Sequence, residues 1–343
     1  MTRAKRSGEK RVNLALQGGG AHGAFTWGVL DHLLEDGRLE IDAISGASAG
    51  AMNAVVMAEG YLDHGRDGAR ANLAAFWLSV SEDGALSPAQ RTLFGQMFKA
   101  FNYDGSPLQI WGEFMTHYAS PYEFNPLNLN PLRDHLEKVV DFEKVRACEH
   151  FKIFVAATNV HTGKIAVFQR EELTASHIMA SACLPTLFQA VEIDGTPFWD
   201  GGYMGNPALF PLFYEKGSPD TIIVQVNPLA RNTTPKTARE IANRLNEITF
   251  NATLLRELRA TDFVIRLIDE GKLPRDRYMR PNLHRIDGGA PLSGFSAATK
   301  LDTSWTFLTQ LRDLGRAAAK AWMHEHYAMV GQNGTLDLRA AYE

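Results

Sequence analysis

Residues 12–30 read VNLALQGGGAHGAFTWGVL, and residues 41–59 read IDAISGASAGAMNAVVMAE. Each stretch begins with a short apolar run, passes through a glycine-rich turn, and ends in an apolar segment long enough for a helix. Two successive strand–turn–helix units at the start of a chain are typical of an α/β fold. We therefore expect a parallel or mostly parallel sheet that is covered by helices.

The second turn, Gly46-Ala47-Ser48-Ala49-Gly50, has the Gly-x-Ser-x-Gly form of a nucleophile elbow. In such an elbow a sharp turn between a strand and a helix exposes the serine hydroxyl. The helix that begins at Ala49 would add its positive N-terminal end at the same point. We therefore expect Ser48 to be a catalytic nucleophile.

The first turn, Gly18-Gly19-Gly20-Ala21-His22-Gly23, has the form of an oxyanion loop. Backbone amides of Gly18, Gly19 and Gly20 would face the negative charge that forms when the serine attacks a carbonyl. Glycine suits these positions because a side chain would block the carbonyl oxygen or forbid the required backbone angles. His22 lies inside the loop, where it could contact a substrate headgroup or simply pack.

A serine hydroxyl is a weak nucleophile without a base. Asp200-Gly201-Gly202 offers one, because it follows residues 191–199, whose Asp194-Gly195 pair predicts a hairpin. A carboxylate flanked by two glycines can approach a neighbouring backbone closely, and partial desolvation would raise its basicity. Asp200 is thus expected to accept the Ser48 proton and return it to the leaving alcohol.

With these motifs in hand, the chain resembles the patatin-like phospholipase family. The resemblance rests on residues 18–23, 46–50 and 200–202, on Ala180-Ser181-Ala182-Cys183-Leu184-Pro185, which looks like the family's ASxxxP segment, and on Asn206-Pro207. These segments occur in the family's order and span about residues 12–230. Residues 92–131 and the C-terminal 100 residues lie outside the shared motifs.

The resemblance implies a three-layer α/β/α fold and a Ser48–Asp200 dyad, with Gly18, Gly19 and Gly20 at the oxyanion hole. Five further glycines would support the motifs: Gly23, Gly46, Gly50, Gly201 and Gly202. The implied reaction is hydrolysis of acyl esters in phospholipid or lysophospholipid, without calcium, another metal or a cofactor. A general carboxylesterase and a polyester depolymerase would use the same dyad and remain open.

A Ser-His-Asp triad is the first rival, since Ser48, Asp200 and His284 occur in the chain order of α/β-hydrolases. That fold normally lays down several strands before its elbow, whereas one strand precedes Ser48. His284 also lies in the apolar stretch Asn282-Leu283-His284-Arg285-Ile286, which is typical of a strand rather than a catalytic loop.

A dinucleotide-binding protein is the second rival, because Gly18-x-Gly20-x-x-Gly23 fits that fingerprint. The acidic residue that would hold the ribose should end the second strand. Glu40 and Asp42 instead come at its start, which argues against this interpretation.

Composition places the chain among globular proteins: 343 residues, 45% hydrophobic and 22% charged, with a net charge of −4. This charge gives no electrostatic case for nucleic acid. Two cysteines make no disulfide framework, and no secretory signal or membrane-spanning run is recognisable. We therefore expect a cytoplasmic enzyme, with peripheral contact at a membrane and the oligomeric state left open.

We expect a flexible basic arm at residues 1–11 and a single domain over residues 12–343. The motif core of this domain covers about residues 12–230, and a helical C-terminal extension covers about residues 236–343. Residues 92–131 form an insertion with many aromatic and proline residues. Buried aromatic side chains are the commoner case, so we expect a satellite core there, with a lid or lipid-facing surface as the alternative.

Overall fold

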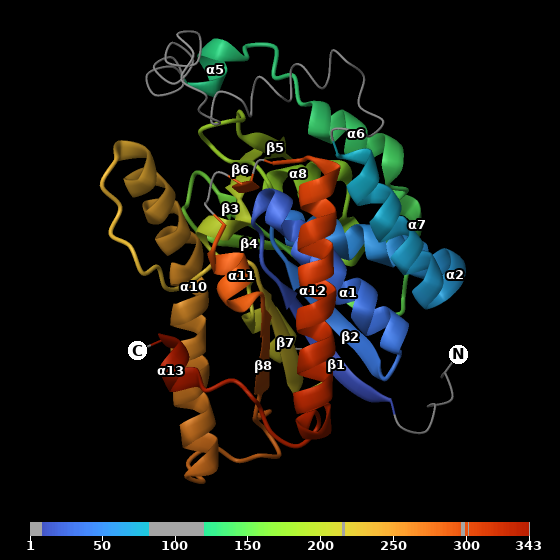
Figure 1. The fold of residues 1–343 in the computed structure, drawn as a ribbon, viewed down its shortest axis with the longest axis vertical. Helices are drawn as coiled ribbons and strands as arrows, with labels where there is room; N and C mark the ends of the chain where they lie inside the picture. The colour runs from blue at the N-terminus through green and yellow to red at the C-terminus, as the bar shows by residue number, and fades with distance from the viewer. Residues whose placement is uncertain (1–8, 82–119, 215–216, 296–298, 301, 343) are drawn as a thin grey trace.

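The computed structural model describes residues 9–81, 120–214, 217–295, 299–300 and 302–342 (Figure 1). Within these ranges, the centre is an eight-stranded sheet with the order β5-β6-β3-β2-β1-β7-β8, and β4 pairs with β3 outside this path. The strands are β1 (Lys10–Leu16), β2 (Leu39–Gly46), β3 (Lys152–Asn159), β4 (Ile165–Gln169), β5 (Val191–Ile193), β6 (Thr196–Asp200), β7 (Asp220–Gln225) and β8 (Asn282–Asp287).

Five neighbouring strands, β3-β2-β1-β7-β8, are parallel. The antiparallel strands β4, β5 and β6 extend the β3 end of the sheet. The expected mostly parallel sheet is therefore confirmed. Parallel strands end at one common edge of the sheet, and both glycine turns follow strands that end there.

The sheet is covered by helices on both faces (Figure 1). The α-helices are α1 (Gly23–Asp36), α2 (Ala49–Ser79), α5 (Pro121–Phe124), α6 (Pro131–Val139), α7 (Phe142–Ala147), α8 (Ala175–Ser181), α9 (Phe210–Tyr214), α10 (Ala238–Asp269), α11 (Gly289–Ser293), α12 (Trp305–His326) and α13 (Leu338–Tyr342). The short 3-10 helices are η1 (Gly20–His22), η2 (Arg170–Glu172), η3 (Gly201–Tyr203) and η5 (Tyr327–Met329).

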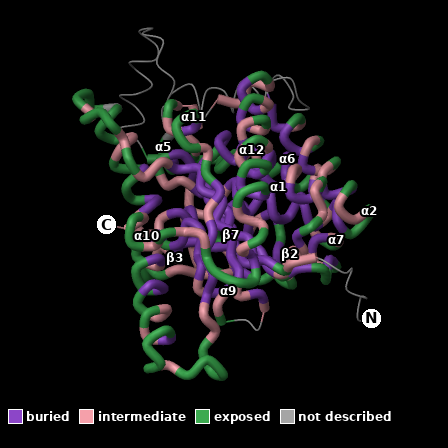
Figure 2. The backbone as a smooth tube through the Cα atoms, turned by 60° about the horizontal axis from the view of Figure 1, so that its bottom comes forward, coloured by how far each residue is buried: buried purple, intermediate pink, exposed green. Residues whose placement is uncertain are grey.

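Alternating side chains of β1 show how the layers form, because successive residues of a strand point to opposite faces. Leu14 and Leu16 belong to the large core cluster that also contains side chains of α1, α2 and α12. Ala15 belongs to a second cluster with Leu254 and Leu258 of α10. The buried strands thus lie between two helical layers, as Figure 2 shows in purple.

The expected elements occur close to their predicted places, with a few differences in extent. β1 already begins at Lys10, whose ammonium group donates to backbone oxygens of Tyr327, Ala328 and Val330. The end of the expected basic arm is therefore part of the sheet. α10, which runs from Ala238 to Asp269, begins the C-terminal extension that was expected to be helical.

The aromatic insertion lies largely outside the described residues, since nothing is described between residues 82 and 119. At its described end, Tyr122, Leu127 and Leu129 are exposed. Among the described helices, none combines the length and the apolar character that crossing a membrane requires.

Candidate active site

Ser48 occupies the turn between β2 and α2, where the sequence predicted a nucleophile elbow. Its backbone angles are φ 51° and ψ −123°, a conformation that residues with a side chain rarely adopt. The Ser48 N–H donates a 2.9 Å hydrogen bond to Oγ of Ser181 at the end of α8. The Ser48 residue is half-buried, so the strained turn leaves its side chain partly accessible.

Asp200 ends β6 and is held by its backbone as well as by its carboxylate. Its N–H donates to the Cys183 carbonyl at 2.8 Å, and its carbonyl accepts from Oγ1 of Thr158 at 2.8 Å. Its Oδ1 accepts from the Gly202 N–H at 2.6 Å, and the carboxylate also accepts a hydrogen bond from the Ser48 side chain. The structure therefore brings the two predicted dyad residues together.

The environment of Asp200 makes its carboxylate unusually basic. The residue is only 1% exposed, and burial raises its pKa from 3.8 to about 7. The hydrogen bonds from Gly202 and Ser48, together with the positive charge of Lys300, oppose this rise. A carboxylate with this pKa is about half ionised at neutral pH, a suitable state for a group that must take and return a proton.

The Gly18 peptide is clamped on both sides. Its N–H donates to Oδ1 of Asn206 at 2.7 Å, and its carbonyl accepts from Nδ2 of Asn227 at 2.7 Å. The Gln17 side chain accepts from the Asn227 N–H at 2.9 Å and so fixes the same corner. The expectation that Gly18 donates to the oxyanion is therefore wrong in this structure, because its amide is already used inside the protein.

Gly19 and Gly20 remain as candidate donors. Gly20 is exposed, whereas Gly19 is buried, so the loop passes from the interior to the surface beside the elbow. A Cβ on Gly18 would lie 2.8 Å from Cβ of Ser48, which places the glycine loop directly against the serine. The N-terminus of α2 follows Ser48 and adds its positive end to this region.

The other predicted motif glycines share close packing. At each one an added Cβ would lie within 3.0 Å of a neighbouring atom: Gly23, Gly46, Gly50, Gly201 and Gly202. At Gly50 the obstacle is the Leu16 carbonyl oxygen at 2.2 Å, and at Gly201 it is the Ala156 carbonyl oxygen at 2.1 Å. Both glycines are needed because backbone approaches backbone there.

His22 packs inside the protein rather than facing a substrate. It is 1% exposed, and its Nε2 shares a 2.8 Å hydrogen bond with Oγ1 of Thr299. Its ring lies beside those of Phe295 and Phe307. Burial lowers the His22 pKa to about 3, so the imidazole is neutral at physiological pH.

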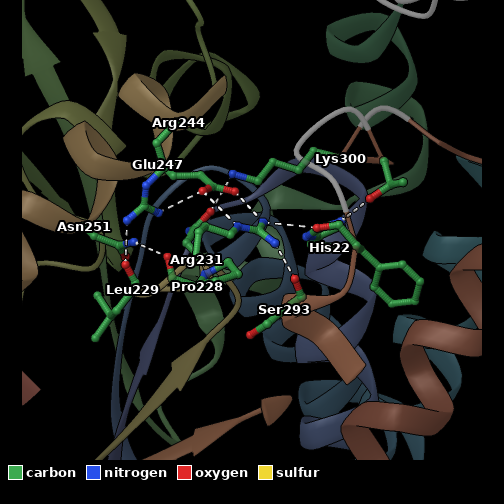
Figure 3. A network of polar contacts seen from close by, with 12 residues as sticks. His22, Pro228, Leu229, Arg231, Arg244, Glu247, Asn251, Ser293 and Lys300 are labelled. Carbon is green, nitrogen blue, oxygen red and sulfur yellow. Dashed lines mark hydrogen bonds and ion pairs between the residues drawn. The ribbon is translucent and has the colours of Figure 1, made fainter. Parts of the chain in front are cut away.

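A cluster of charges borders the glycine loop (Figure 3). The Glu247 carboxylate on α10 accepts from Nη2 of Arg231 at 2.6 Å and from Nη1 of Arg244 at 3.0 Å. Arg231 also donates to the backbone oxygens of Ser293 and Phe295. Through Arg231, Glu247 of α10 is therefore connected to the end of α11 and the segment that follows it. Lys300 enters the same cluster from that segment, and its Nζ donates to Oδ1 of Asn227 at 2.7 Å.

The two rival interpretations fail on geometry. His284 is fully buried, and its ring nitrogens contact Oδ1 of Asp220 and Oγ1 of Thr335, each at 3.0 Å. Asp220 begins β7, so this pair lies at the opposite end of the parallel strands from the elbow. Asp42 interacts with Arg11 and the Ser218 N–H at that same end, away from the glycine loop.

Several residues that shape the site were missed as functional residues. Ser181 and Asn206 lie in segments that carried the family resemblance, but the motif gave them no role. Asn227 lies two residues beyond the carboxyl end of β7, where polar side chains meet a site in parallel sheets, and that position was an available signal. Lys300 had no such signal, because only the folded chain brings it to the glycine loop.

Within the described part of the chain, no group of three or more histidine, cysteine, aspartate or glutamate side chains is arranged to hold a metal ion.

The chain is similar to proteins of known family. The family model for patatin-like phospholipases matches residues 14–213. VipD from Legionella pneumophila is similar at 16% identity and a TM-score of 0.33, over 91% of this chain and 72% of that one. The ExoU–SpcU complex of the Pseudomonas aeruginosa type III secretion system is similar at 19% identity and a TM-score of 0.30. This match covers 71% of this chain and 51% of that one. No curated protein matches the chain. Because the family match covers more than half of its length, the chain belongs to the patatin-like phospholipase family, which implies a lipid acyl hydrolase.

Proposed function

We propose that this protein hydrolyses acyl esters of phospholipids or lysophospholipids through a Ser48–Asp200 dyad and an acyl-enzyme intermediate. The observation that carries the proposal is the hydrogen bond between the Ser48 side chain and a fully buried Asp200 whose pKa is about 7. A nucleophile in contact with a base of matched basicity is the arrangement that acyl transfer requires.

In the first half of the reaction, Ser48 Oγ attacks the ester carbonyl carbon while its proton passes to the Asp200 carboxylate. The carbonyl oxygen becomes an oxyanion, which the N–H groups of Gly19 and Gly20 and the N-terminus of α2 stabilise. The tetrahedral intermediate then expels the alcohol, and Asp200 returns the proton to the departing oxygen. The products are an acyl-serine and a free alcohol.

In the second half, water attacks the acyl-serine carbonyl and gives its proton to Asp200. Collapse of the second tetrahedral intermediate breaks the bond to Ser48 Oγ, which regains the proton. The fatty acid leaves, and both residues return to their starting states. The same group thus serves as base and acid in turn, and its pKa near neutrality suits both tasks.

Labelling with a fluorophosphonate tests the nucleophile, and turnover of long-chain phosphatidylcholine in mixed micelles tests the substrate class. We expect one adduct on Ser48, located by peptide mass spectrometry. Ser48→Ala should abolish labelling and turnover. Asp200→Asn should lower turnover about 10⁴-fold, as loss of a dyad's base removes proton transfer.

Two exposed or half-buried residues provide matched controls: Ser176→Ala on α8 and Asp67→Asn on α2 should each keep wild-type activity. Substantial turnover in Asp200→Asn would exclude the dyad. A further outcome is labelling of Ser48 with hydrolysis of short water-soluble esters or polyesters but not of phospholipid. This result would support the dyad and would favour a carboxylesterase or a polyester depolymerase over a phospholipase.

A further inference from the structure

Two residues of the C-terminal extension, Thr299 and Lys300, contact the glycine loop at two points and the neighbouring Asn227 at a third. Oγ1 of Thr299 lies 2.8 Å from Nε2 of His22, inside the loop. Nζ of Lys300 donates to Asn227 at 2.7 Å. The carbonyl oxygen of Lys300 lies 2.4 Å from the position that a Cβ on Gly20 would occupy.

A continuous chain of hydrogen bonds connects the Lys300 ammonium group with the loop backbone. Asn227 accepts from Lys300 through Oδ1 and donates through Nδ2 to the Gly18 carbonyl at 2.7 Å. A carboxamide whose oxygen is bound to a cation has its N–H₂ group fixed in orientation. Lys300 therefore holds the clamp that orients the peptide immediately before Gly19.

The positive charge of Lys300 interacts electrostatically with Asp200. The charged and titratable groups that face it come from four elements: Asp200 at the end of β6, Glu247 of α10, Arg231 of the loop after β7, and His22 of η1. Burial, the largest cause, and the positive charge of Arg231 lower the Lys300 pKa, whereas the negative charges of Glu247 and Asp200 raise it; the net result is a pKa of about 8. In return, Lys300 lowers the Asp200 pKa.

We propose that Lys300 is a positioning residue of the reaction, which fixes the oxyanion loop through Asn227 and places a positive charge beside the dyad. This role rests on the proposed dyad mechanism. Negative charge develops on the substrate oxygen during attack, and a preorganised cation nearby stabilises it more than it stabilises the neutral ester. The ammonium group of Lys300 does this without touching the substrate.

A pH profile distinguishes this role from simple packing. Activity should rise as Asp200 ionises near pH 7 and fall as Lys300 loses its proton near pH 8. Lys300→Arg retains the positive charge at high pH, because arginine stays protonated above pH 12. This variant should therefore move the alkaline limb to higher pH. Lys300→Met should lower kcat/KM about tenfold, with little change in KM, and move the acid limb to higher pH.

The experiment measures pH profiles of kcat/KM and of the fluorophosphonate labelling rate for wild type, Lys300→Met and Lys300→Arg. Lys320→Met, on the exposed side of α12, is the matched control and should match wild type. If the Met variant proves unfolded by circular dichroism, the alkaline limb of the Arg variant decides the question.

Wild type that is not labelled at Ser48 would contradict the dyad itself. Two outcomes in labelled wild type would overturn the role of Lys300 alone. One is an alkaline limb that stays near pH 8 in Lys300→Arg, and the other is a folded Lys300→Met with an unchanged pH profile. Partial rescue by arginine, with the alkaline limb moved upward, is the result that the structure leads us to expect.

Discussion

Replacing Asp200 with asparagine should stabilise the protein while it abolishes turnover, because the dyad keeps a carboxylate where water cannot solvate it. Asp200 is 1% exposed, and burial raises its pKa from 3.8 to about 7. Asparagine has nearly the same shape. Its oxygen can accept from Gly202, and its amide can donate to Ser48, so the variant removes the charge and keeps the contacts.

The sign and size of the effect follow from proton binding. Between about pH 4 and pH 7 the folded state keeps a proton on Asp200 that the unfolded chain has already released, so the free energy of unfolding falls as the pH rises through this window. A pKa raised from 3.8 to about 7 corresponds to about 4 kcal/mol. Asparagine does not titrate, so its advantage over aspartate should grow by about 2–3 kcal/mol between pH 5 and pH 8.

Urea unfolding at pH 5, 6.5 and 8 measures this difference directly. Subtracting wild type from Asp200→Asn cancels the titration of every other group that the two proteins share. Asp67→Asn, at an exposed position of α2, is the matched aspartate-to-asparagine control. A stability difference between Asp200→Asn and wild type that is flat across this range would refute the raised pKa, and with it the argument for Asp200 as a neutral-pH base.

Further predictions concern activity, a buried hydrogen-bonded pair and a glycine. In wild type, kcat/KM should fall along an acid limb centred near pH 7, because only the ionised form of Asp200 accepts a proton; kcat/KM measured at pH 6 should be about tenfold below the plateau. His284→Ala removes one hydrogen-bond partner of the buried Asp220 and should lower the free energy of unfolding in urea by about 1–3 kcal/mol, yet folded protein should still be labelled at Ser48; loss of labelling would favour the triad. Gly50→Ala forces a methyl group to within 2.2 Å of the Leu16 carbonyl oxygen, so it should unfold at clearly lower urea than wild type, and unchanged stability would contradict the close packing of the elbow.

Local pattern was sufficient to predict the two strand–turn–helix units and the positions of Ser48 and Asp200. A Gly-x-Ser-x-Gly turn encodes its own geometry, because its glycines permit backbone contacts that any side chain would prevent. The mostly parallel sheet followed from the same spacing. These features depend on residues that are close together in the chain.

The clamp on the oxyanion loop could not be predicted in the same way. Gly18 looked like an oxyanion donor from its motif, but Asn206 lies 188 positions away and uses its amide. Lys300 reaches Asn227 across 73 positions, from an extension that has no motif. Such contacts depend on how β7, α10 and the segment before α12 meet, and a single sequence carries little information about that packing.

Activation of Ser48 by Asp200 is tested most directly by fluorophosphonate labelling of wild type and Asp200→Asn, followed by peptide mass spectrometry. We expect a single adduct on Ser48 in wild type and a labelling rate that falls by orders of magnitude in the folded Asp200→Asn variant. Equal labelling rates in the two proteins, or an adduct at another residue, would contradict activation of Ser48 by Asp200.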